Sequence, residues 1–281
     1  MADAIADRVR RYILDGSDAD QQRLMGVSEA FAEPARRAFA RAGVSEGWTV
    51  IDCGCGPMGA IAVLAEMVGP TGRVVGVDFS EAAVGRARSI ADAVGLENVS
   101  LHAGDIHELD PATLGAPFDL AFCRLFLVHQ SDPIRTLTQM AKLLRPGGLI
   151  VAHEALLDPT PRSYPALDAL PAYWTLIHQM IATAGGEREA VEQLPTAALA
   201  AGLEIEEFSG FFTSLGPEVG FDLHAASMAA ARVRAESTGV PAERIDELVA
   251  SLRAAKAGNY DWVLSPFFFD LRLRKPAAAD A

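Results

Sequence analysis

The chain has 281 residues, half of them hydrophobic, which is enough to bury the core of one large domain or of a domain with an appended module. The formal net charge is −13, so we expect no nucleic-acid partner, because a polyanion would meet a repulsive field. The first twenty residues contain no apolar leader and no apolar run approaches the ~20 residues of a membrane helix, so the sequence predicts a cytoplasmic protein with no membrane partner.

The order of apolar runs along the chain predicts the fold class. Residues 1–45 are expected to form an N-terminal helical cap, in which Ile5, Val9, Tyr12 and Ile13 recur with helical spacing. Residues 46–155 alternate helical patterns with short apolar runs at 48–54, 72–79, 99–105, 118–124 and 148–154. This alternation predicts an α/β fold with a doubly wound parallel sheet. Residues 156–281 are expected to add strands at 203–212 and 261–275 and helical insertions at about 160–200 and 217–258, the second of them as two helices joined at Gly239-Val240-Pro241.

A glycine-rich turn follows the first apolar run. In VIDCGCGPMGAIAVL, Gly54, Gly56 and Gly59 have the spacing of a dinucleotide-binding turn. Asp52, however, precedes the first glycine, where a carboxylate would repel a pyrophosphate and would suit a ligand with an amine or another cationic group. The turn alone is therefore compatible with NAD or with another cofactor that carries an adenosine.

Acidic residues also end the next two apolar runs. Asp78 follows the first turn by roughly 20 residues, the place where an acid binds ribose hydroxyls in dinucleotide-binding proteins. Asp105, in AGDIHEL, can accept a hydrogen bond from an adenine amine while Ile106 packs on the ring. An adenosine ligand with a cationic head and no phosphate is S-adenosyl-L-methionine.

The segments VIDCGCGPMG, VVGVDFS, AGDI, FDLAFCRLFLVHQSDP and LRPGGLIV resemble, in order, the successive motifs of class I S-adenosylmethionine-dependent methyltransferases of the small-molecule type. The resemblance covers about residues 45–155 and departs from the pattern at Pro57-Met58. It implies a Rossmann-like seven-stranded sheet with an antiparallel last strand, a role that 203–212 and 261–275 fit. The helical insertions would then form a substrate lid above the carboxyl ends of the strands.

The same resemblance implies a set of cofactor-binding residues. It places Asp52, Gly54 and Gly56 around the methionine part and Asp78 at the ribose. It places Phe79, Asp105 and Ile106 at the adenine, with Gly104 also among the cofactor residues, and Cys123 and Arg124 beside the sulfonium. Taken singly, the glycines are also compatible with a tight strand-to-helix turn and Asp78 with a helix cap. The three cysteines of the chain lack metal-ligand spacing, and no metal site is expected.

Candidate catalytic and substrate residues lie outside these motifs. His129 in FLVHQSDP is the first candidate for a base or substrate orienter, and an anchor for its loop is the alternative; Arg124 and His153 are the other catalytic candidates. For substrate contacts we consider residues of the helical insertions and their flanks: Trp174, His178, His224 and Phe212. The apolar stripes in these helices are equally typical of ordinary core faces.

The predicted function is methyl transfer to a small, largely apolar or aromatic metabolite, such as one of secondary metabolism. A protein of the same fold that binds S-adenosylmethionine without methylating, such as a cyclase, has the same cofactor motifs and stays open. An NAD(P)-dependent oxidoreductase is disfavoured by Asp52 and by the lack of a Tyr/Lys pair for hydride transfer. A homodimer is left open as the assembly.

Overall fold

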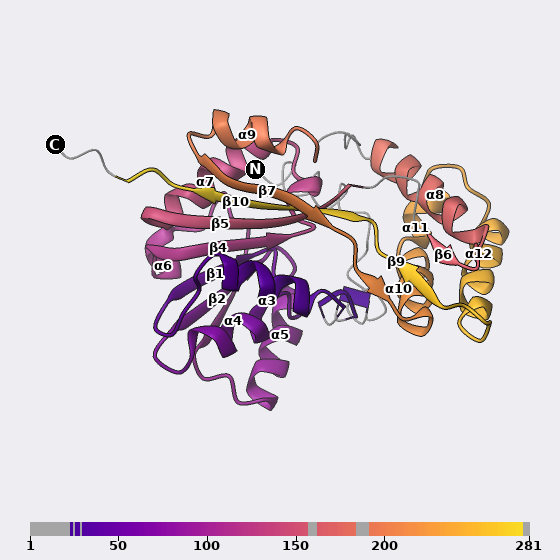
Figure 1. Ribbon diagram of the computed structural model, residues 1–281, viewed down its shortest axis with the longest axis horizontal. Helices are drawn as coiled ribbons and strands as arrows, with labels where there is room; N and C mark the ends of the chain where they lie inside the picture. Colours follow the sequence, from indigo (N-terminus) through magenta and orange to yellow (C-terminus); the bar gives the residue numbers. More distant parts are fainter. Residues whose placement is uncertain (1–22, 25, 29, 157–161, 184–190, 278–281) are drawn as a thin grey trace. The chain divides into compact units, whose positions relative to one another are not determined.

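The computed structural model describes residues 23–24, 26–28, 30–156, 162–183 and 191–277 (Figure 1). The helical pattern predicted at residues 5–13 lies outside these ranges. The chain divides into two compact units. The sheet unit comprises Phe31–Glu154, Val191–Gly210 and Phe269–Ala281, and the helical unit comprises Met1–Ala30, Ala155–Ala190 and Phe211–Phe268.

The sheet unit is built on one mixed sheet. Among the described residues, seven strands pair in the order β3-β2-β1-β4-β5-β10-β7. Their bounds are β1 Thr49–Cys53, β2 Arg73–Asp78, β3 Val99–Ala103, β4 Phe118–Arg124, β5 Leu144–Leu156, β7 Glu204–Phe211 and β10 Phe267–Arg274. The pairs β1–β2, β2–β3, β1–β4 and β4–β5 are parallel, and the last strand, β10, runs antiparallel between β5 and β7 (Figure 1). The predicted Rossmann-like sheet is confirmed.

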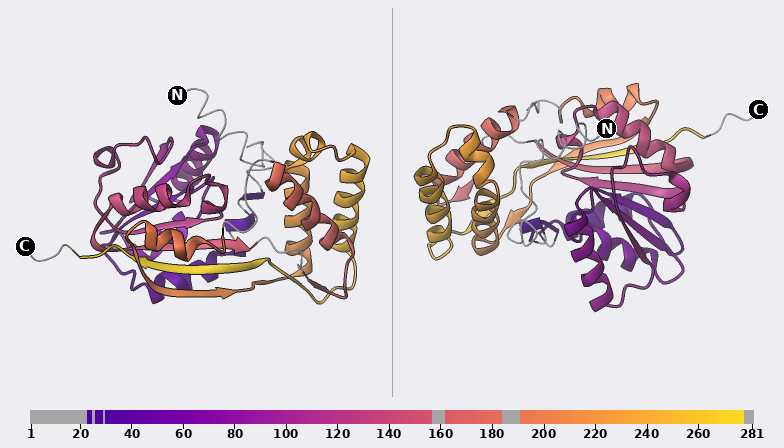
Figure 2. Two further views of the ribbon diagram at one scale, coloured as in Figure 1. Left: turned by 90° about the horizontal axis from the view of Figure 1, so that it is seen from above. Right: turned by 180° about the vertical axis from the view of Figure 1, so that it is seen from behind.

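Helices cover both faces of this sheet (Figure 2). Their bounds are α3 Ala32–Arg41, α4 Ile61–Val68, α5 Glu81–Ala93, α6 Pro111–Leu114, α7 Pro133–Leu143 and α9 Leu194–Ala200, with a short 3-10 helix, η1, at Leu127–His129. Local sequence explains where they begin: Ser80 accepts a hydrogen bond from the Ala83 amide at the start of α5, and Asp132 accepts one from the Arg135 amide just before Pro133 opens α7. Strand β1 and its two neighbours, β2 and β4, are mostly buried along their length, so the sheet is apolar on both of its faces.

The helical unit has its own core. It contains α8 Ala169–Thr183, α10 Pro217–Ala230, α11 Arg232–Ser237 and α12 Ala242–Ala255, with a small antiparallel sheet in the order β6-β9-β8, formed by Ser163–Tyr164, Trp262–Leu264 and Ser214–Leu215. The apolar stripes of α8 and α12 are buried against each other and against α10. The apolar stripes of α8 and α12 therefore form the core of the helical unit, as ordinary core faces do.

Two predicted elements differ in the structure. The fully described range 217–258 holds three helices rather than the two expected, because the chain turns at Ala231 without a glycine or proline to signal it. The single strand expected at 261–275 is two strands, β9 and β10, separated at Ser265 and Pro266. Proline has no amide hydrogen to give to a strand ladder, and the amide of Ser265 bonds the carbonyl of Thr213 instead. Within the described ranges, no helix combines the length and the apolar character needed to cross a membrane.

Candidate functional site

The glycine turn joins the end of β1 to α4. Gly54 has φ 76° and its amide donates to the carbonyl of Val77 at 2.8 Å, which ties the turn to β2. A Cβ atom on Gly54 would lie 2.5 Å from the ring of Phe126, in the loop after β4. Both the positive φ and this close approach require glycine here. The turn is thus fitted against the loop that follows β4.

Asp52 is a buried acid beneath this turn. Its Oδ2 accepts a hydrogen bond from the Ala60 amide at 2.7 Å, and a Cβ on Gly59 would come within 2.4 Å of that oxygen. Burial raises the pKa of Asp52 to about 6, against the opposing effects of the Ala60 amide and of the positive charge of Arg124. Arg124 ends β4 and donates from Nη2 to the carbonyl of Gly59 at 3.2 Å, and burial lowers its pKa to about 10.

Asp78 connects the ends of β1 and β2. One carboxylate oxygen accepts from the amide of Gly56 at 2.8 Å, and the other accepts from the amide of Ser80 at 2.8 Å. The side chain therefore organises the glycine turn and the start of α5 together. Phe79, the next residue, has a side chain that is 40% exposed at this edge. The negative charge of Asp78 also contributes to the raised pKa of Asp52.

Asp105 follows β3 in the same arrangement. The amide of Gly104, where φ is 155°, donates to the carbonyl of Asp78 at 2.9 Å. Oδ1 of Asp105 accepts from the amide of His107 at 3.0 Å, and Ile106 is buried. The carboxyl ends of β1, β2 and β3 are therefore linked by hydrogen bonds, and each carries one acidic side chain.

Glu154, in β5, is a site residue that the sequence pattern does not identify. Its side chain is fully buried, Oε1 accepts from the amides of Phe126 and Leu127 at 3.0 and 2.9 Å, and Oε2 accepts from the amide of Val128 at 3.3 Å. Burial raises the pKa of Glu154 to about 7, although these three amides favour its charged form. The thiol of Cys123 also donates to Oε1, at 3.9 Å. Because the other three partners are backbone amides, no pattern of side chains signals this role.

More than half of the chain resembles a known family of proteins. Residues 44–193 match the family model described as a methyltransferase domain. The chain belongs to this family. The predicted kinship with class I S-adenosylmethionine-dependent methyltransferases is therefore confirmed.

Individual relatives agree with the family assignment. The chain is 32% identical over 145 residues to a trans-aconitate 2-methyltransferase of Azoarcus sp., a match to 52% of this chain and 51% of that protein. It is 33% identical over 144 residues to a nocamycin O-methyltransferase of Saccharothrix syringae, a match to 50% of this chain and 49% of that protein. The chain thus spans about half the length of these relatives. The crystal structure of the [4+2]-cyclase SpnF shares the fold, with 21% identity, a TM-score of 0.50, and coverage of 86% of this chain and 80% of that one.

The two candidate histidines of this methyltransferase-family chain lie in different surroundings. His129 ends η1, on the loop that Glu154 holds, and is half-buried. His153 has no exposed surface: its Nε2 lies 3.5 Å from Oδ1 of Asp270, its ring meets that of Phe122 edge-on, and burial lowers its pKa. The catalytic roles of both residues stay predictions.

The three thiols of this methyltransferase-family chain are buried. Cys53 lies in β1, Cys55 in the glycine turn and Cys123 in β4, and burial raises the pKa of each thiol. Thiolate chemistry is therefore disfavoured at neutral pH. Within the described part of the chain, no group of three or more His, Cys, Asp or Glu side chains is placed to hold a metal ion.

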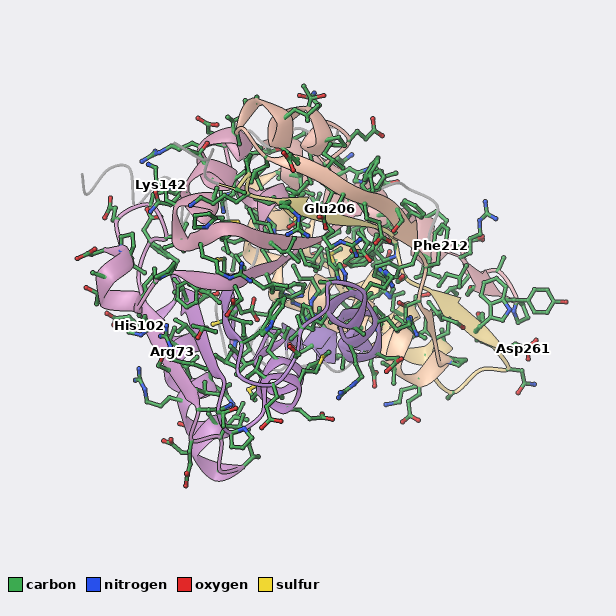
Figure 3. All side chains as sticks on the ribbon, turned by 60° about the vertical axis from the view of Figure 1, so that its left-hand side comes forward. Arg73, His102, Lys142, Glu206, Phe212 and Asp261 are labelled. Atoms are coloured by element: carbon green, nitrogen blue, oxygen red, sulfur yellow. The ribbon has the colours of Figure 1, made fainter. Side chains whose placement is uncertain are left out.

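The predicted substrate residues lie in the helical unit. Trp174 on α8 and His224 on α10 are both buried and their rings are in edge-to-face contact, whereas His178, one turn after Trp174, is half-buried. Phe212, which Figure 3 labels, is 54% exposed. Its ring contacts that of Phe267. Of the four residues, Trp174 and His224 are therefore in ring contact.

Proposed function

We propose that this chain transfers a methyl group from S-adenosyl-L-methionine to a small, largely apolar or aromatic metabolite by in-line displacement. The observation that carries the proposal is the set of acidic side chains Asp52, Asp78 and Asp105 at the linked ends of three neighbouring parallel strands, around a glycine turn. Open α/β sheets bind their ligands at this edge.

The charges at this edge fit such a cofactor. The negative charge of Asp78 disfavours the ionisation of Asp52, and the positive charge of Arg124 favours it. Two acids against one base attract a sulfonium and an ammonium group, and they repel a pyrophosphate. The charge balance therefore supports S-adenosylmethionine over a dinucleotide.

Each residue is assigned one role. Asp52 would hold the methionine part together with Gly54 and Gly56, and Asp78 would bind the ribose hydroxyls. Phe79 would pack on the adenine ring. Asp105 and Ile106, next to Gly104, would contact the edge of the adenine. Cys123 and Arg124 would border the sulfonium and the acceptor.

To catalyse methyl transfer, the chain has chiefly to align the acceptor with the methyl group and to exclude water. Positioning alone can lower the activation free energy by ~7–11 kcal/mol. When bound, the cofactor supplies the electrophilic methyl group. We assign to His129 the removal of the acceptor's proton or the orientation of the acceptor, because it lies on the loop that packs against the glycine turn. His153 would act only after its pocket opened, since it is fully buried.

Substrate selection is assigned to the helical unit, with Trp174, His178, His224 and Phe212 as contacts. The relatives named above act, by their names, on trans-aconitate and on nocamycin, which are small molecules rather than macromolecules. We also propose a cytoplasmic location, no nucleic-acid or membrane partner, and no requirement for a metal ion.

Calorimetric titration tests this function. The chain should bind S-adenosylhomocysteine and should not bind NADH. The change Asp78→Ala should weaken S-adenosylhomocysteine binding by about 1.5–3 kcal/mol, the loss of hydrogen bonds to a charged acceptor. Asp119→Ala is a matched control, because Asp119 lies in β4 and pairs with Arg145 away from these strand ends. A preference for NADH would overturn the proposal.

A cyclase that binds S-adenosylmethionine is the alternative, and the fold shared with SpnF favours retaining it. Incubating the protein with a metabolite and methyl-labelled S-adenosylmethionine separates the two functions. Label in the product supports methyl transfer, and a converted but unlabelled product supports cyclisation.

A further inference from the structure

Three aromatic rings meet in the core of the helical unit. Tyr173 and Trp174 are consecutive residues of α8, and His224 lies on α10. The ring centroids of His224 lie 5.0 Å from Tyr173 and 5.9 Å from Trp174, and all three side chains are at least nine-tenths buried. The buried residues around them are overwhelmingly apolar, so each polar atom of the three rings needs a hydrogen-bond partner within the group or from a bound molecule.

The contacts of His224 determine its tautomer. Its Nδ1 lies 2.6 Å from the carbonyl oxygen of Gly220, and because a carbonyl only accepts, Nδ1 carries the proton and donates. Burial lowers the pKa of His224, so the ring is neutral at physiological pH. Its Nε2 then presents a lone pair, and within the described residues this atom accepts no hydrogen bond.

Trp174 holds the complementary group. Its indole Nε1 is buried and has no hydrogen-bond partner in the described part of the chain, whereas the hydroxyl of Tyr173 is paired with Ser227. One unpaired donor and one unpaired acceptor therefore belong to rings in contact. Leaving the indole Nε1 of Trp174 buried and unpaired costs folding free energy, which a bound partner would recover.

We propose that Trp174 and His224 form a binding site for the hydroxyl group of a small aromatic or aliphatic alcohol. The hydroxyl would donate to Nε2 of His224 and accept from the Nε1–H of Trp174. This inference rests on the proposed function and narrows its substrate class to hydroxylated molecules.

Two features favour a hydroxyl over other polar groups. A hydroxyl is the smallest group that donates and accepts at one atom. A carboxylate would face the lone pair of Nε2, and an ether has no proton to give it.

The probe is phenol, with anisole and toluene as matched ligands that keep the ring and lose first the donor and then the acceptor. Binding is measured by NMR titration of the full chain saturated with S-adenosylhomocysteine. We expect phenol to bind at least fivefold more tightly than either control. Trp174→Phe removes the donor, and His224→Asn removes Nε2 while leaving an amide to donate to Gly220. Each change should reduce the preference for phenol to less than twofold.

Controls separate this site from general effects on folding. Trp262→Phe makes the same substitution on the small sheet, where Trp262 stacks on Tyr164, and should leave the preference for phenol intact. Each variant should keep its affinity for S-adenosylhomocysteine, which shows that the sheet unit folds, and the far-UV circular dichroism of the natural chain, which shows that the helical unit folds. No preference for phenol in the natural chain, or a preference unchanged in both variants, would overturn the site, because the two nitrogens would then serve an internal water. A failure to bind S-adenosylhomocysteine at all would instead overturn the proposed function.

Discussion

The sheet unit and the helical unit satisfy their buried polar groups by different means. At the strand ends of the sheet unit, backbone amides lie outside any helix or ladder, and buried or half-buried acids accept from them: Asp52 from Ala60, Asp78 from Gly56, and Glu154 from the loop after β4. In the helical unit, helices satisfy their own amides and the core is assembled from apolar side chains. The geometry of the proposed cofactor site thus depends on a few charges, and that of the helical unit on packing.

Removing the acid with the most backbone partners is expected to have the largest effect. At pH 8, Glu154→Ala leaves three buried amides without an acceptor and should lower the free energy of unfolding by about 3–5 kcal/mol. Glu154→Gln keeps one carbonyl oxygen and should lose less than half as much. Urea denaturation measures both. A loss below 1 kcal/mol for the alanine variant would contradict the role of Glu154 in holding the loop.

A cavity in the helical core should have a smaller and different effect. Leu252 is fully buried in α12, and Leu252→Ala should lower the free energy of unfolding by about 2–4 kcal/mol, because it removes apolar packing and leaves an empty space behind. The affinity for S-adenosylhomocysteine should stay within twofold, because Leu252 packs against other residues of the helical unit. If that affinity fell tenfold in the folded variant, the geometry of the cofactor site would depend on the packing of the helical unit as well.

A methyl group on the glycine turn tests the close approach at the strand ends. Gly54→Ala would place Cβ 2.5 Å from the ring of Phe126 and should weaken S-adenosylhomocysteine binding by about 2 kcal/mol, roughly thirtyfold. Gly95→Ala is the matched control: φ is 72° there too, but no other atom lies within 4 Å of the new Cβ. It should cost stability without changing affinity. Equal losses of affinity would show that strain, not the contact with Phe126, governs binding.

The sequence predicts the strand ends well and their hydrogen bonds poorly. Asp52, Asp78 and Asp105 can be placed at one edge because each ends an apolar run and the ends of parallel strands meet. Their partners are backbone amides several residues away, which no residue type marks. The same reason hides Glu154. His153 and Glu154 are adjacent in β5 and so point to opposite faces of the sheet, and a run of apolar neighbours does not reveal which of the two meets the loop.

Short strands and unsignalled turns account for the other differences. β6, β8 and β9 have two or three residues each and pair across long stretches of chain, so no local alternation identifies them. The alternation of Leu271 and Leu273 with arginines favours one strand that continues back through Pro266, where the ladder is in fact broken. Pro266 could have predicted that break. The prediction of one continuous strand is wrong because it follows the alternation of residues and disregards the proline.

The smallest predicted effect is a pH dependence that belongs to the buried acid of the sheet unit. Burial raises the pKa of Glu154 from its ordinary 4.5 to about 7, so between these values the folded chain binds a proton that the unfolded chain has lost. Stability from this group is therefore full below pH 4.5 and declines as the pH rises through 7, by at most about 1.4 kcal/mol per pH unit. Asp52 adds a decline of the same sign, and the buried histidines, whose pKa values are lowered, oppose it.

Comparing the natural chain with Glu154→Gln isolates the contribution of Glu154, because glutamine does not titrate. The natural chain should be the more stable of the two at pH 6, and its advantage in unfolding free energy should shrink by about 1–2 kcal/mol between pH 6 and pH 8. Urea denaturation at the two pH values measures this difference. An advantage that grew over this range would mean that the amides of Phe126, Leu127 and Val128 outweigh burial and hold the carboxylate charged.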